Sequence, residues 1–135
     1  MATTVRTELM DCRTTTDVVL VRQAVRTWAM ELGFSLVDQT KMVTAASELA
    51  RNAVEYGGGG TVLLERIDDG LRRGLRLTFE DRGPGIADIE RAMTDGFTTG
   101  GGLGLGLSGA RRLVNDFAIV SAPGQGTRVT VVRWK

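Results

Sequence analysis

The chain has 135 residues, 42% of them hydrophobic, and a formal net charge of +1, which predicts one domain (residues 1–135) without the basic field that nucleic acid or a membrane surface requires. Histidine is absent, which excludes a Ser-His-Asp triad, a histidine general base and a phosphoacceptor histidine. Cys12 is the single cysteine, so we expect no internal disulfide. No long apolar run opens the chain, so we expect neither a signal peptide nor a membrane helix. Together these observations predict a cytoplasmic location.

The first half of the chain predicts one strand and two helices. Residues 5–10 alternate weakly, as an edge strand does. Residues 14–34 predict a helix that is capped by Thr15 or Thr16 and ended by Gly33. The expected core-facing side of this helix consists of Val18, Val21, Val25, Trp28 and Ala29. A second helix is predicted over about residues 37–56, and the glycines that follow it end it.

The second half of the chain predicts two hairpins separated by short helices. Strands are expected at residues 61–67 and 74–81, and again at 117–122 and 127–134. Short helices are expected within residues 87–97 and 107–116. Since most strands are joined by hairpins, we predict an α+β two-layer sandwich, in which a mixed, mostly antiparallel sheet carries helices on one face.

A glycine-rich stretch, "FTTGGGLGLGLSGARR" at residues 97–112, precedes the last predicted helix. A P-loop would need a lysine after the glycines, and a dinucleotide-binding turn would need a strand directly before them. Neither is present. Alone, the stretch fits a flexible linker as well as a loop whose backbone approaches phosphate.

Two further patterns carry polar side chains. The first pattern ends the predicted strand at residues 74–81 and places Asp81 beside Gly83 and Gly85. These residues could open a cleft to a planar ligand, or they could form a Pro-Gly turn that is capped by Asp81. Glu48 and Asn52 lie four residues apart among small and apolar residues, and therefore on one helix face. They could be a solvated pair, or a carboxylate base beside an amide oxygen that binds Mg²⁺.

The order of these patterns, E-x-x-x-N on a helix, D-x-G-x-G after a strand and G-x-G-x-G before a helix, resembles the GHKL fold of DNA gyrase, Hsp90, histidine kinases and MutL. The resemblance covers about residues 48–127. Within that superfamily, "ASELARNAVEYGGG", "EDRGPGI" and "GQGTRVTVVRW" are most similar to the small serine/threonine kinases of the anti-sigma-factor and stressosome type. Without a histidine of its own, such a kinase would act on another protein.

The resemblance implies a role for each motif residue. Glu48 would orient or deprotonate the attacking hydroxyl of a target Ser or Thr, and Asn52 would hold Mg²⁺. Asp81 would accept a hydrogen bond from the adenine amino group of ATP. The other expected nucleotide contacts lie in the turn after Asp81, in an ATP lid at about residues 95–107, at the start of the helix behind the lid and beside the adenine. They are Gly83, Gly85, Ile86, Thr98, Thr99, Gly102, Leu103, Gly104, Leu105, Gly106, Leu107, Ser108 and Thr127.

The resemblance also implies protein partners. Stressosome-type kinases phosphorylate STAS-domain proteins that sequester them and, once released, activate a PP2C-type phosphatase. Two alternatives remain open at this point: an anti-sigma kinase that binds a sigma factor directly, and a catalytically silent module whose ATP site shapes a binding surface. Arg51, Arg111 and Arg112 lie near the motifs, and each is either a cation for the phosphates or a surface arginine.

Overall fold

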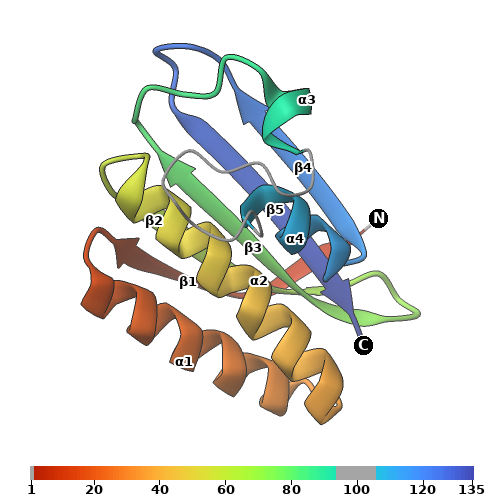
Figure 1. The fold of residues 1–135 in the computed structure, drawn as a ribbon. Helices are drawn as coiled ribbons and strands as arrows, with labels where there is room; N and C mark the ends of the chain where they lie inside the picture. Colours follow the sequence, from red (N-terminus) through yellow and green to blue (C-terminus); the bar gives the residue numbers. More distant parts are fainter. Residues whose placement is uncertain (1, 94–105) are drawn as a thin grey trace.

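The computed structural model describes residues 2–93 and 106–135, which form an α+β sandwich (Figure 1). The elements in chain order are β1 (Thr3–Cys12), α1 (Thr15–Glu31), α2 (Leu36–Glu55), β2 (Gly60–Asp68), β3 (Arg73–Asp81), α3 (Ile89–Ala92), α4 (Gly106–Arg112), β4 (Asp116–Ser121) and β5 (Thr127–Trp134). The strands form one sheet in the order β1-β2-β3-β5-β4. All four described pairings are antiparallel, so the sheet expected as mixed contains no parallel pair among these strands.

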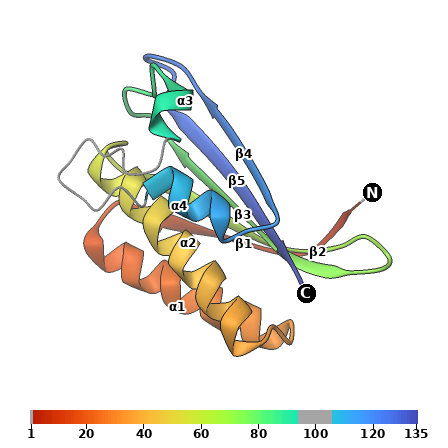
Figure 2. The same ribbon diagram turned by 45° about the vertical axis from the view of Figure 1, so that its right-hand side comes forward.

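The helices cover one face of the sheet and leave the other open (Figure 2). The apolar side predicted for α1 is the buried side, from Val18 to Ala29. Its cap differs from the prediction: the side chain of Thr14, and not of Thr15 or Thr16, accepts a hydrogen bond from the Asp17 amide. Gly33 ends this region with a φ of +85°, a conformation that favours glycine.

Helix α2 lies against the middle of the sheet because its buried side carries mostly small residues. Alanine side chains let a helix approach its neighbours closely while still removing apolar surface from water. Along α2, Met42 and Leu49 fill the larger spaces. The buried alanines of this helix are Ala45, Ala46, Ala50 and Ala53.

The two remaining helices are shorter than predicted. Helix α3 is four residues long. Helix α4 begins at Gly106 and ends at Arg112, whereas the sequence predicted a helix as far as residue 116. The chain leaves α4 early because Asn115 already pairs with the sheet: its amide donates to the Val132 carbonyl at 2.9 Å. No helix within residues 2–93 and 106–135 is both long and apolar enough to cross a membrane.

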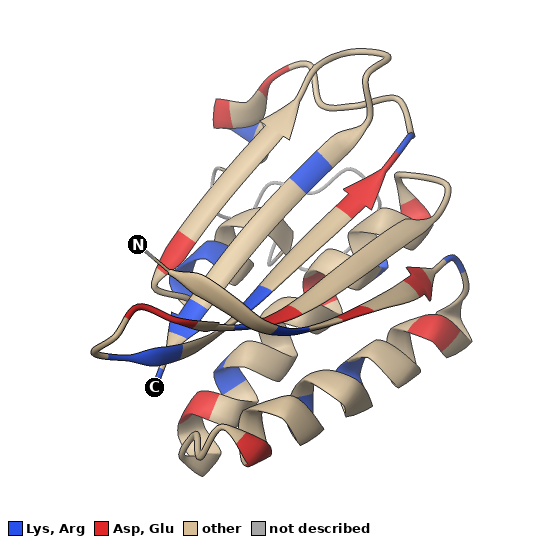
Figure 3. Ribbon diagram, turned by 180° about the vertical axis from the view of Figure 1, so that it is seen from behind, with Lys and Arg blue, Asp and Glu red and all other residues tan. Residues whose placement is uncertain are grey.

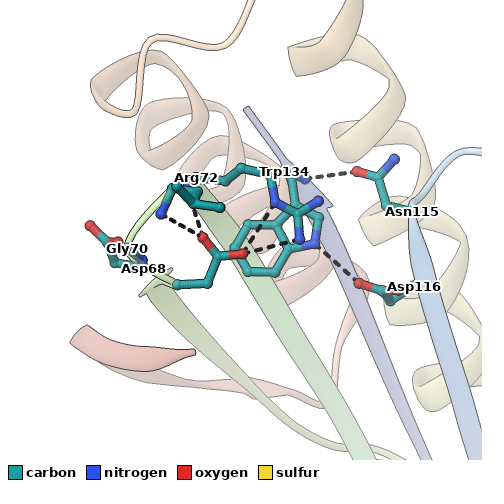
Figure 4. A network of polar contacts seen from close by, with 8 residues as sticks. Asp68, Gly70, Arg72, Asn115, Asp116 and Trp134 are labelled. Atoms are coloured by element: carbon teal, nitrogen blue, oxygen red, sulfur yellow. Dashed lines mark hydrogen bonds and ion pairs between the residues drawn. The ribbon is translucent and has the colours of Figure 1, made fainter. Parts of the chain in front are cut away.

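The end of the sheet that holds the β2–β3 turn is fixed around Trp134 (Figure 4). The Trp134 amide donates to Asn115 Oδ1 at 2.8 Å, and its indole Nε1 donates to Asp116 Oδ2 at 3.2 Å. The guanidinium of Arg72 lies 4.2 Å from the ring centroid, within cation–π range. These contacts anchor β4 and β5 at the end of the sheet opposite Asp81, which is the last residue of β3.

The strands of the sheet contain several charged residues (Figure 3). The clearest contact there joins Glu65 and Arg76, neighbours on β2 and β3. Arg76 Nε donates to Glu65 Oε1 at 2.9 Å and Nη2 donates to Oε2 at 3.0 Å, and the Thr4 hydroxyl donates to Oε2 at 3.0 Å. The hydrogen bond from Arg76, foremost among the causes, holds the pKa of Glu65 below its usual range.

This lowered pKa predicts an acid-sensitive contribution to stability. A carboxyl with a lowered folded-state pKa stabilises the fold above its unfolded-state pKa, about 4.3 for Glu, and that stabilisation is lost as pH falls through the folded-state value. Glu65→Gln has no such charge to lose. We therefore expect the free energy of unfolding to fall less between pH 7 and pH 3 in Glu65→Gln than in the wild type, as measured by urea denaturation. Equal losses in both proteins would contradict this assignment.

Candidate active site

One end of the sheet brings Asp81, Thr127 and Ser121 side by side. The strand register pairs Asp81 on β3 with Thr127 on β5, and Thr127 with Ser121 on β4. Alternate residues of a strand share a face, so Asp81 points to the same side as the buried Phe79. Paired residues of neighbouring strands also share a face. All three polar side chains therefore lie on the helix-covered face, at its edge.

Within the described part of the chain, the two oxygens of the Asp81 carboxylate differ in their contacts. Oδ1 accepts a hydrogen bond from the Gly83 amide at 2.9 Å, which closes a tight turn. Among the residues that the structure describes, none donates a hydrogen bond to Oδ2. The capped turn and the ligand-binding carboxylate, which were alternatives at the sequence level, are thus compatible, because they use different oxygens of one side chain.

Glycines allow three segments to meet around this carboxylate. A Cβ on Gly57, which follows α2, would lie 2.5 Å from Asp81 Oδ2. A Cβ on Gly83 would lie 2.6 Å from the Cα of Gly57. A Cβ on Gly85, whose φ is +75°, would collide with the Ala122 carbonyl oxygen. Gly83 and Gly85 were expected here from the sequence, whereas Gly57 belongs to a run of four glycines that predicted only the end of a helix.

Gly126 meets the same turn from the other side and gives a test of this packing. Its φ is +74°, and a Cβ there would collide with the Asp81 carbonyl oxygen. We expect Gly126→Ala to lower the free energy of unfolding by about 2–4 kcal/mol, from backbone strain plus the collision. Gly124 is a matched control, since its φ is +75° but nothing lies within 4 Å of its Cβ position. Equal destabilisation by Gly124→Ala and Gly126→Ala in urea denaturation would contradict the collision.

Ser121 joins the elements of this end of the sheet, although it was not among the predicted site residues. The Ile86 amide donates to Ser121 Oγ at 2.8 Å, and Ser121 Oγ donates to the Gly126 carbonyl at 2.8 Å. Ser121 Oγ also lies 2.8 Å from Thr127 Oγ1. Alternating polarity along the last hairpin would have placed Ser121 on the face of Phe117 and Ile119, but no motif marks it.

The second part of the site lies where α2 meets α4 (Figure 1). Asn52 Nδ2 is 3.3 Å from the Cβ position of Gly106, so the first residue of α4 packs directly on this amide. Glu48, one turn earlier on α2, has a side chain that is 21% exposed and lies 3.4 Å from the Arg51 guanidinium, Oε1 to Nη1. Both side chains remain partly accessible, and Asn52 lies beside the N-terminal end of α4.

Of the other residues predicted for the site, some lie in α4 and others lie outside the described part of the chain. Ser108 is buried and Leu107 is half-buried, packed against the core. Most of the expected lid at residues 95–107 lies outside the described residues. The predicted contacts in this part of the chain are Thr98, Thr99, Gly102, Leu103, Gly104 and Leu105. Arg51 pairs with Glu48, whereas Arg111 lines a pocket with residues of α3 and β4, among them Ile89 and Phe117.

The described residues provide few ligands for a metal ion. Within residues 2–93 and 106–135, no group of three or more His, Cys, Asp or Glu could hold a metal ion. Mg²⁺ needs few protein ligands when phosphate oxygens and water complete its octahedral shell. The amide oxygen of Asn52 is a hard donor of the required kind, and it lies beside the partly accessible Glu48.

Comparisons with known proteins identify the family of this chain. Residues 37–135 match the family described as histidine kinase-, DNA gyrase B- and HSP90-like ATPase. The chain belongs to this ATPase family. It is 48% identical over 118 residues to the serine/threonine-protein kinase RsbT of Bacillus subtilis, with 87% of this chain and 89% of RsbT covered. It is 29% identical to the anti-sigma F factor of Thermoanaerobacter sp., with 84% and 82% covered.

Solved structures show the same ATPase fold. The crystal structure of the RsbU and RsbW domains of Rv1364c from Mycobacterium tuberculosis superposes with a TM-score of 0.67 at 25% identity, over 97% of this chain and 33% of that longer chain. The mycobacterial sensor histidine kinase MprB superposes with a TM-score of 0.53 at 20% identity, over 96% of this chain and 97% of that chain. The α+β sandwich predicted from the sequence is thereby confirmed.

These matches also classify the activity. The extent and identity of the match to RsbT make this member of the ATPase family an ATP-dependent protein kinase. Its similarity to both RsbT and an anti-sigma factor groups it with the partner-switching kinases.

Proposed function

We propose that the chain transfers the γ-phosphate of MgATP to a serine or threonine of a STAS-domain protein, as a switch kinase of a bacterial stress-signalling pathway. The observation that carries the proposal is the placement of Glu48 and Asn52 on one face of α2, with Asn52 against the first residue of α4. The 48% identity to RsbT supports the same class of reaction.

Adenine would bind at the end of the sheet. Oδ2 of Asp81 accepts a hydrogen bond from the amino group of the base, and the Thr127 hydroxyl lies on the neighbouring strand. The glycine turn at residues 83–85 offers a surface of backbone without side chains, against which a planar ring packs closely. Ile86, half-buried and bound through its amide to Ser121, closes the apolar side of this position.

The phosphates would lie toward α4. Asn52 contributes its amide oxygen to Mg²⁺, which neutralises charge on the phosphate oxygens when it is bound. Residues 95–107 would close over the nucleotide as the lid, and amides at the start of α4 would face its phosphates. In this arrangement one domain, residues 1–135, supplies all of the nucleotide contacts.

Glu48 would act on the incoming hydroxyl group. As the hydroxyl oxygen of the target forms a bond to the γ-phosphorus, the bond from that phosphorus to the β-phosphate oxygen breaks, and the hydroxyl proton passes to the Glu48 carboxylate. Arg51, at 3.4 Å from this carboxylate, keeps it oriented before transfer. Positioning and charge neutralisation provide most of the catalysis in this reaction class.

The partners follow from the kinase class. A STAS-domain protein would hold the kinase until its own serine or threonine is phosphorylated, and the released kinase would then bind and activate a PP2C-type phosphatase. The similarity to an anti-sigma F factor, 29% identity over 84% of the chain, favours a second candidate, in which the kinase holds a sigma factor directly.

A phosphorylation assay tests the proposal and separates the two candidates. The kinase is incubated with MgATP and each STAS-domain protein of the same cell, and phosphate on the STAS protein is measured by intact-mass spectrometry. We expect one STAS protein to gain a single phosphate, which is lost when its acceptor serine or threonine is replaced by alanine. No phosphorylation of any STAS protein, together with a stable complex between the kinase and a sigma factor, would overturn the first candidate in favour of the second.

A further inference from the structure

The hydrogen bonds around Ser121 determine which way the Thr127 hydroxyl can donate. A hydroxyl group has one proton to donate and two lone pairs that accept. The Gly126 carbonyl can only accept, so Ser121 Oγ gives it its single proton, over 2.8 Å. The Ile86 amide can only donate, so it occupies one lone pair of Ser121 Oγ, also over 2.8 Å.

The remaining lone pair of Ser121 faces Thr127. Ser121 Oγ and Thr127 Oγ1 are 2.8 Å apart, and either could be the donor when this pair is taken alone. Because the proton of Ser121 is already committed to Gly126, the donor in this pair is Thr127. With its proton committed to Ser121, Thr127 Oγ1 offers only lone pairs to a bound ligand.

Asp81 and Thr127 then form a matched pair of acceptors. They are directly paired across β3 and β5, with side chains on the same face. Asp81 contributes the free Oδ2 of its carboxylate, since Oδ1 accepts from Gly83. Two acceptors favour an amino group, which has protons to donate, and disfavour a carbonyl oxygen, which has none.

We propose that Ser121 is a specificity-determining residue, which fixes Thr127 as an acceptor and thereby selects a purine with an amino group at position 6 over one with a carbonyl there. Ser121 touches neither the base nor the phosphates in this arrangement, so it is a positioning residue that acts through Thr127. The inference rests on the proposed nucleotide site, and it adds the origin of base discrimination to that site.

The test compares ATP with ITP, whose base carries a carbonyl oxygen in place of the amino group. Calorimetric titration with each nucleotide and Mg²⁺ gives the ratio of the two dissociation constants. We expect the wild type to bind ATP at least about tenfold more tightly than ITP. In Ser121→Ala the Thr127 hydroxyl is free to turn its proton toward the ITP carbonyl, so the ratio should fall by about threefold or more, toward the preference that Asp81 alone maintains.

Three further variants separate specificity from a general structural effect. Thr127→Val should lower the ratio as Ser121→Ala does, and the double variant should lower it no further, because both changes remove the same selection. Ser121→Thr keeps a hydroxyl and should restore the wild-type ratio. Additive losses in the double variant would contradict a shared mechanism.

The outcomes distinguish this inference from the proposed function. A wild type that binds ATP, with Ser121→Ala weakening ATP and ITP by the same factor, overturns the role of Ser121 and leaves the nucleotide site in place. A wild type that binds ATP and ITP equally overturns it as well. Failure of the wild type to bind either nucleotide overturns both the inference and the proposed function.

Discussion

Glu48→Gln should lower the rate of phosphate transfer by about two to four orders of magnitude and leave the affinity for ATP almost unchanged. Glutamine has nearly the same shape as glutamate and can still receive a hydrogen bond from Arg51, but it cannot take up the proton of the attacking hydroxyl. Glu48 lies beside the expected phosphates and away from the adenine end of the site. Single-turnover transfer to the phosphoacceptor and calorimetric titration of MgATP measure the two quantities separately.

Glu55→Gln is the matched control for this variant. Glu55 is the last residue of α2 and is exposed, so the change removes one carboxylate from the same helix without touching the site. Its transfer rate should equal that of the wild type. A Glu48→Gln protein that transfers phosphate at the wild-type rate would remove Glu48 from the mechanism.

Asp81→Asn should weaken ATP binding by about 10- to 100-fold, the effect of losing a hydrogen bond to a charged group. Asparagine can keep the bond from the Gly83 amide through Oδ1, so the turn is preserved. Its amino group then occupies the position of the free Oδ2, where it meets the amino group of adenine, and two donors face each other. Calorimetric titration of MgATP gives the two dissociation constants.

Asp116→Asn is the control for Asp81→Asn. Asp116 accepts a hydrogen bond from the Trp134 indole at the other end of the sheet, so its replacement changes the net charge by the same amount away from the site. ATP affinity should be unaffected in this variant. Equal weakening by both variants would indicate a general effect of charge, and unchanged binding in Asp81→Asn would exclude Asp81 as the adenine acceptor.

Much of the fold could be predicted because its elements are locally determined. The apolar period of α1 identified the buried residues Val18 to Ala29, and the alternation and turn residues of both hairpins identified four of the strands within one or two positions. The cap at Thr14 was missed because three consecutive threonines offer equal capping chemistry. The early end of α4 was missed because it depends on Asn115 pairing with β5, a contact made only in the folded sheet.

The candidate site could be predicted less completely. Motif spacing predicted Glu48, Asn52 and Asp81 as site residues, because each belongs to a pattern within a few residues of the chain, and the family resemblance added Thr127 to this prediction. Ser121 and Gly57 take part only through tertiary contacts, Ser121 with Ile86 and Gly57 with Asp81. A serine in a strand and a glycine in a glycine run carry no local signal of such a role, and the tertiary contacts were needed to find them.

The location of the nucleotide is the central claim, and amide chemical-shift mapping tests it most directly. The ¹⁵N-labelled protein is titrated with MgATP, and the shifts of backbone amides and of the two tryptophan indoles are followed. We predict the largest changes at Gly83, Gly85 and Thr127, next to Asp81, and no change at the indole of Trp134 at the opposite end of the sheet. Shifts centred on Trp134 or on the open face of the sheet, with the amides around Asp81 unmoved, would contradict the account.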